Sequence, residues 1–236
     1  MRKLLCIPFV FLMACGNTPT VKVKEPLKQL RSEPIIPIER RYQDLNDSVL
    51  VLKSKLRKQL TENNEEGKKR MIRCFTDLIF QSYFEIWNGT PWAFYGTTRT
   101  PQKGTIACGY FVTTILEDMG VPIKRVEMAK TYSEKMIKTL VQTENIKKYT
   151  PFNLVNFVKD LSKKSDGVYL AGLDNHTGFI VVKNHEVYFI HSSVISPGCV
   201  VREKALESVA LQINRYTVLG CLTEDHVFMN AWLNGK

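Results

Sequence analysis

Apolar residues recur at steps of three and four along the first half of the chain, a spacing that predicts amphipathic helices. The stripe from Leu45 to Leu60 is the clearest example. Asn88-Gly89 is a helix-ending signal, and Thr150-Pro151 is typical of an N-cap followed by a first-turn proline. Five helices are therefore expected, over residues 44–60, 68–87, 105–120, 131–145 and 151–162.

The pattern changes in the second half to short runs rich in Val, Ile, Tyr and Phe, which are typical of strands. Asn184-His185 separates two of these runs and indicates a hairpin turn. Helices followed by an antiparallel meander predict an α+β fold, with the N-terminal helices packed on an antiparallel sheet. The expected strands are residues 167–173, 177–183, 186–191, 200–202 and 215–222, with a short helix over 204–213.

The N-terminus has the pattern of a bacterial lipoprotein signal. Residues 1–14 combine a basic start with an apolar stretch too short to span a bilayer. They end in Leu12-Met13-Ala14-Cys15, which resembles a lipobox and predicts a lipid on Cys15; the alternative is an ordinary secretory signal. Residues 15–41 are rich in proline and are expected to form a tether, with the folded domain over 42–236. This predicts a cell-envelope protein anchored by its lipid to the inner membrane, the outer membrane or the cell surface.

Charge and cysteine content narrow the function classes. The formal net charge of +10 favours anionic surroundings such as lipid headgroups or wall polymers. Nucleic acid is not expected as a partner, because zinc-finger, helix-turn-helix and RNA-recognition patterns are missing from the sequence. Beyond Cys6 and Cys15, the cysteines form no C-x-x-C pair, which argues against a zinc ribbon. The sequence leaves open whether two of Cys74, Cys199 and Cys221 form a disulfide.

Cys108 is the candidate nucleophile. It opens the third expected helix, where the macrodipole and unpaired backbone N–H groups favour the thiolate. His176 and His191 fall on two strands joined by a tight hairpin, so one imidazole can act as a base while the other orients it. His185 falls in the turn and His226 has no evident partner. Together these residues indicate a Cys-His-His triad.

Four stretches then resemble the NlpC-type peptidases, which are papain-like bacterial cell-wall hydrolases. They occur in the order of that family, each in the expected structural context, and span roughly residues 85–195. They correspond to the family's tyrosine loop, nucleophile helix, base strand and following strand. The matching stretches are Gly89–Thr97, Ala107–Val112, Asn175–Ile180 and Phe189–Ser192.

The resemblance implies a papain-like core and specific residue roles. Cys108 would be the nucleophile, His176 the base and His191 the residue that orients the base. Tyr95 matches a loop tyrosine beside the nucleophile. With Trp92 and Gly109 in the matched stretches, it is assigned to substrate binding. The family cleaves peptidoglycan stem peptides, commonly at the γ-linked D-glutamyl bond to the diamino acid, and needs no metal or other cofactor.

The chain also departs from the family pattern. Ala107 and Gly109 replace the Asp and Ser beside the nucleophile, Tyr110 replaces a Gly, and Thr97 replaces the second Gly of the tyrosine loop. About 55 residues between Gly120 and Asn175 exceed the usual connection. Two other functions stay open: a non-catalytic lipoprotein that binds wall peptide or a protein partner, and an acyl transferase or transpeptidase on the same fold.

Overall fold

The computed structural model of the chain describes residues 36–60 and 65–235. The predicted signal peptide, the lipid site Cys15 and most of the predicted tether lie outside these residues. In the described part, no helix is long and apolar enough to cross a membrane. The α-helices there are α1 (Ile38–Leu60), α2 (Glu65–Asp77), α3 (Phe84–Trp87), α4 (Cys108–Asp118), α5 (Arg125–Ala129), α6 (Ser133–Leu140), α7 (Leu154–Leu161), α8 (Val209–Gln212) and α9 (His226–Asn234).

The strands form one six-stranded antiparallel sheet in the order β1-β6-β2-β3-β4-β5. Strands β2 to β5 are the predicted meander, and β6 returns to pair with β2. Helices together with an antiparallel sheet confirm the α+β class. The strands are β1 (Ile146–Tyr149), β2 (Gly167–Gly172), β3 (Thr177–Lys183), β4 (Glu186–Ser192), β5 (Val200–Lys204) and β6 (Thr217–Cys221).

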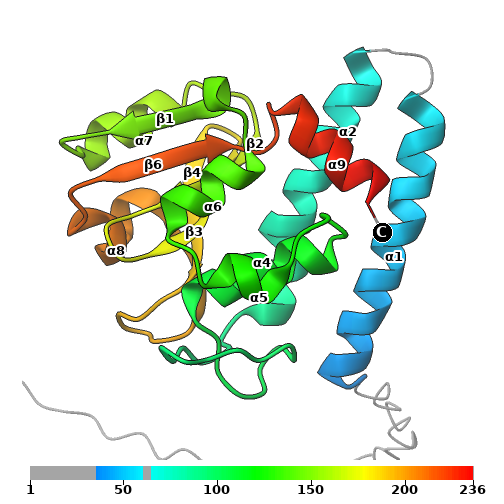
Figure 1. The fold of residues 1–236 in the computed structure, drawn as a ribbon, viewed down its shortest axis with the longest axis horizontal. Coiled ribbons are helices and arrows are strands. Elements are labelled where there is room, and N and C mark those ends of the chain that lie inside the picture. The colour runs from blue at the N-terminus through cyan, green and yellow to red at the C-terminus, as the bar shows by residue number, and fades with distance from the viewer. Residues whose placement is uncertain (1–35, 61–64, 236) are drawn as a thin grey trace, which may run out of the picture. The chain divides into compact units, whose positions relative to one another are not determined.

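Each face of the sheet is buried by helices (Figure 1). Helices α4 and α6 pack on one face, and α1 packs behind this layer against α2 and α9. On the other face, Phe157 and Leu161 of α7 and Leu211 of α8 form a second core with the sheet. Because alternate residues of a strand point to opposite faces, both sets of side chains in the central strands are apolar. Of the N-terminal helices predicted to pack on the sheet, α2 contacts β2 and α3 contacts β5, whereas α1 packs against other helices. The sheet is covered on its second face as well.

Helix boundaries differ from prediction at several points. Helix α1 begins at Ile38, directly after Pro37, so residues 38–41 belong to a helix and not to the tether. The expected single helix over 68–87 contains a π-helical segment, η1 (Leu78–Tyr83), between α2 and α3. Thr150-Pro151 does not open α7: the N-cap is Asn153, whose side chain accepts a hydrogen bond from the backbone N–H of Asn156.

Other elements were not predicted or were predicted with the wrong extent. The expected helix over 131–145 ends at Leu140, and β1 follows as an edge strand with two exposed lysines in its centre. Such a polar edge strand lacks the alternation that a sequence pattern detects. The expected short helix over 204–213 consists of a 3₁₀ turn, Ala205–Glu207, and α8. Helices α5 and α9 were not predicted at all; α5 has only five residues.

Candidate active site

Cys108 is the first residue of α4, and its thiol lies where the helix N-terminus meets the start of β3. The N-cap Ala107 has an extended backbone and provides no side-chain cap. Backbone N–H groups of Thr177, Gly109 and Cys108 itself lie within hydrogen-bonding reach of the sulfur. Burial raises the pKa of the Cys108 thiol, and these hydrogen bonds offset that rise only in part. The predicted effect of the helix N-terminus on the thiol is thus present in its backbone N–H groups, but burial outweighs it.

His176 and His191 lie in direct contact. His176 precedes β3 and is half-buried, whereas His191 in β4 is completely buried. The two are diagonal neighbours, since His191 lies across from Gly178, one step beyond the Phe179–Ile190 pair. Their rings approach at 81°, with His176 Nε2 and His191 Nδ1 2.7 Å apart. The prediction that they share one face of the hairpin is correct, although His176 stands just before the strand.

Gly178 provides the space for this contact. A Cβ atom at that position would lie 2.7 Å from the Cβ of His191 and 2.6 Å from the ring of Phe189. Phe189 also stacks on the His191 ring at 4.1 Å between centroids. The absence of a side chain at Gly178 thus allows the imidazoles of His176 and His191 to meet above it.

Glu203 of β5 extends the pair into a line of three groups and was not predicted. Its Oε1 lies 2.8 Å from His191 Nε2. Burial alone would raise the pKa of the Glu203 carboxyl, but the hydrogen bond from His191 lowers it below its ordinary value. The predicted strand stopped at residue 202, one residue short of Glu203. An acidic residue in the strand next to His191 was the available signal.

The carboxylate fixes where each proton lies. Ionised Glu203 can only accept, so His191 Nε2 carries the hydrogen of that bond and His191 Nδ1 accepts from His176 Nε2. The remaining nitrogen of His176, Nδ1, is then unprotonated. Burial, and secondarily the neighbouring His191, lowers the pKa of His176 to about 3, so its imidazole is neutral at physiological pH. A neutral imidazole with a free lone pair is a competent general base.

Cys108 and His176 lie together between two recesses. The larger has a volume of about 680 Å³, and the predicted substrate residues Trp92, Tyr95 and Gly109 all line it. Tyr95 is 88% exposed, so its ring stands free at the rim. The smaller recess, of about 250 Å³, lies between residues 129–133 and the turn at 173–177. A cleft that continues on both sides of the thiol can hold a chain with groups on each side of the attacked bond.

The other histidines and cysteines lie outside this arrangement. His185 occupies the exposed hairpin turn and His226 begins α9. Cys74, Cys199 and Cys221 are free thiols in the structure, as is Cys108. Over residues 36–60 and 65–235, no three His, Cys, Asp or Glu side chains are grouped so as to hold a metal ion.

The site therefore brings together every predicted catalytic and substrate residue and adds Glu203 to them. Comparisons of the chain with protein-family models, with curated proteins and with solved structures found no match.

Proposed function

We propose that this chain is a thiol-dependent amide hydrolase with a papain-like, NlpC-type site. The observation that carries the proposal is the hydrogen-bonded line from Glu203 through His191 to His176, which ends in the cleft that Cys108 lines. A half-buried carboxylate orients one histidine, which in turn orients a second histidine beside a thiol. A base that is oriented by further groups next to the nucleophile is the arrangement typical of nucleophilic catalysis.

In the first half of the reaction, Cys108 Sγ attacks the substrate carbonyl carbon while His176 Nδ1 takes the thiol proton. The resulting oxyanion is stabilised by N–H groups of the first turn of α4, which have no partner within the helix. The C–N bond then breaks, and the leaving nitrogen takes the proton from His176, which leaves an acyl thioester on Cys108.

In the second half, His176 takes a proton from water as the water oxygen attacks the thioester. The C–S bond breaks, the acid leaves, and Cys108 regains its proton from His176. His191 and Glu203 hold the base nitrogen toward the thiol and stabilise the transient positive charge on His176. No step draws on a cofactor.

The proposed substrate is a peptidoglycan stem peptide, reached by a chain anchored in the cell envelope through a lipid on Cys15. The resemblance in the matched stretches supports this choice. The cleft adds support, since Lys130 lines it, is exposed and forms no ion pair with a described residue, so its ammonium is open to a substrate carboxylate. Stem peptides carry several carboxylates.

The test is mass spectrometry of purified muropeptides incubated with the full chain. Wild type and Cys108→Ala are compared with Cys74→Ala, which removes a half-buried thiol of α2 far from the cleft in sequence and fold. New fragments with wild type and Cys74→Ala, but not with Cys108→Ala, are expected and would identify the bond cleaved. Fragments that persist in Cys108→Ala would refute the assignment.

A binding role is the second candidate, and the raised pKa of the Cys108 thiol favours it. A binding protein would leave all muropeptides intact while still binding them in the cleft. Because Trp92 lines the cleft, its fluorescence would report such binding. Saturable quenching by intact muropeptides, together with a lack of fragments from wild type, would select this role over hydrolysis.

A further inference from the structure

Arg125 is buried beneath the cleft, yet it forms no ion pair with a described residue. It is the first residue of α5 and only 4% exposed. Its Nε donates to Thr114 Oγ1 at 2.6 Å, and one terminal nitrogen donates to the backbone carbonyls of Thr97 and Thr98 at 2.9 and 3.0 Å. A buried charge is costly, so this guanidinium is retained against a desolvation penalty.

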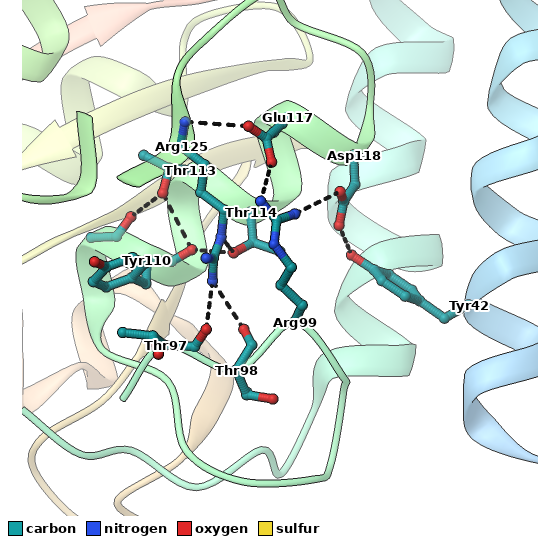
Figure 2. A network of polar contacts seen from close by, with 11 residues as sticks. Tyr42, Thr97, Thr98, Arg99, Tyr110, Thr113, Thr114, Glu117, Asp118 and Arg125 are labelled. Atoms are coloured by element: carbon teal, nitrogen blue, oxygen red, sulfur yellow. Dashed lines mark hydrogen bonds and ion pairs between the residues drawn. The ribbon is translucent and has the colours of Figure 1, made fainter. Parts of the chain in front are cut away.

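Tyr110 completes the surroundings of this side chain. The guanidinium carbon lies 4.8 Å from the centre of the Tyr110 ring (Figure 2). The backbone N–H of Arg125 donates to Oε1 of Glu117. The other carboxylate oxygen of Glu117, Oε2, accepts a hydrogen bond from Arg99. Figure 2 shows the Arg125 side chain running past Thr114 of α4 and ending at the carbonyls of Thr97 and Thr98 below it. One side chain thus connects three segments that are distant in sequence.

Two of these segments form walls of the cleft. The loop held through its carbonyls carries Trp92 and Tyr95, and Ala129 and Lys130, at the end of the helix that Arg125 begins, line the cleft as well. Both walls flank Cys108. Phe94 and Tyr95 at the rim are largely exposed, and Trp92 is half-buried, so backbone hydrogen bonds contribute more than side-chain packing to the position of this loop.

Gly109 and Tyr110, two departures from the family pattern, both lie against α5. A Cβ at Gly109 would lie 2.7 Å from the carbonyl oxygen of Ala129, so no larger residue fits there. Tyr110 provides the ring on which Arg125 rests. Gly109, Tyr110 and α5 therefore form one structural feature: the added segment packs against the start of the nucleophile helix.

We propose that Arg125, supported by Tyr110, is a positioning residue that fixes the distance between the two walls of the cleft and thereby selects the substrate. The selection of a substrate rests on the proposed hydrolase function, whereas the positioning does not. Arginine is required because its planar guanidinium donates in several fixed directions at once, which a lysine ammonium on a flexible stem does not.

The test is hydrogen exchange of the full chain, read by mass spectrometry, in wild type, Arg125→Lys and Tyr110→Leu. In the loop, the backbone N–H of Thr98 donates to Thr105, and that of Ala107 donates to Gly96. We expect exchange of these amides, and of residues 128–131, to rise about tenfold or more in Arg125→Lys while β3 and β4 keep their protection. Tyr110→Leu, which removes only the ring, should show the same pattern more weakly and serves if Arg125→Lys does not fold.

The matched control is Arg99→Lys. Arg99 belongs to the same network but pairs with the carboxylates of Glu117 and Asp118 and donates to no loop carbonyl. In Arg99→Lys, exchange of the loop amides and of residues 128–131 should stay within about twofold of wild type. Unchanged loop exchange in both Arg125→Lys and Tyr110→Leu, a rise spread evenly over the whole domain, or an equal rise in Arg99→Lys would overturn the proposal.

Activity gives a second readout. With muropeptides, Arg125→Lys should raise KM about tenfold and change kcat much less, while alkylation of Cys108 by iodoacetamide stays within about twofold. An equal fall in kcat and kcat/KM with slower alkylation would mean a general structural role and would overturn the proposal. If wild type turns over no muropeptide, the proposed function fails, but hydrogen exchange still decides whether Arg125 positions the walls.

Discussion

His191 Nε2 and Glu203 Oε1 lie 2.8 Å apart on neighbouring strands, and this bond determines the protonation of a histidine that Glu203 does not touch. Because the carboxylate only accepts, His191 presents its unprotonated Nδ1 to His176. His176 must then carry its hydrogen on Nε2 and leave Nδ1 free. The tautomer of the base His176 is thus set by Glu203, two hydrogen bonds away from it. Glu203 lies in a strand that the matched family stretches do not include.

Replacing Glu203 by Gln is expected to lower kcat on the order of a hundredfold or more with the fold intact. A carboxamide can donate as well as accept, so it also allows the opposite tautomer of His191, in which Nδ1 carries the hydrogen and no longer accepts from His176. Nitrogen-15 NMR of the imidazoles would show both histidines as Nε2–H tautomers in wild type and a mixture in the variant.

The control for this variant is Glu186→Gln, which changes an exposed glutamate at the start of β4 that pairs with Lys204. It should keep both the wild-type kcat and the wild-type tautomers. Wild-type tautomers in Glu203→Gln would show that His191 is oriented by something other than Glu203.

Gly178→Ala should disrupt the contact between the two histidines. The added Cβ would lie 2.7 Å from the Cβ of His191, and we expect a loss of about 1–3 kcal/mol in the free energy of unfolding together with loss of most activity. Gly220→Ala is the control in another strand, since its Cβ would lie 2.7 Å from the side chain of Ile137, away from the histidines. Urea unfolding should show destabilisation in both, and only Gly178→Ala should lose activity. Retained activity in Gly178→Ala would mean that the imidazoles do not need this spacing.

The sequence predicted those parts of the fold and site that depend on local pattern. The hairpin at Asn184-His185 is one case: both residues have positive φ, at 51° and 64°, as a two-residue turn between strands of this twist requires. The order Cys108, His176, His191 is another, because a helix start and a strand pair can each be recognised within a few residues. Such signals do not depend on distant parts of the chain.

The sequence did not predict what depends on contacts between distant segments. Glu203 becomes a partner of His191 only through the register of β4 and β5, which no local pattern specifies. In the sequence, Arg125 cannot be told from a surface residue. Its role depends on hydrogen bonds to the loop carbonyls of Thr97 and Thr98, which only the fold brings near. The net pKa of Cys108 was not predictable for the same reason: the helix N-terminus was visible in the sequence, but the burial of the thiol, which outweighs it, was not.

The raised pKa of Cys108 predicts a distinctive pH dependence of alkylation. Since burial keeps the thiol protonated, the thiolate is a minor species at neutral pH, and its fraction grows as pH rises toward the pKa. The second-order rate constant for iodoacetamide, followed on the Cys108 peptide by mass spectrometry, should rise throughout pH 7 to 9.5. A plateau that begins near pH 5 would instead reveal a stable thiolate–imidazolium pair with His176.

Acid should destabilise the fold through His176. Burial, and then the adjacent His191, lowers the pKa of His176 to about 3 from its ordinary 6.5, so below pH 6.5 the unfolded chain takes up a proton that the folded chain does not. Stability is therefore lost as pH falls from 6.5 toward 3, by about 3 kcal/mol at pH 4 from this residue alone. Urea unfolding at pH 7 and pH 4 measures this loss in the free energy of unfolding, which should be smaller in His176→Gln than in wild type. The control His185→Gln, in the exposed turn, should keep the wild-type loss. Equal losses in all three proteins would mean that His176 is not held neutral by its surroundings, and the assignment of a neutral base would fail with it.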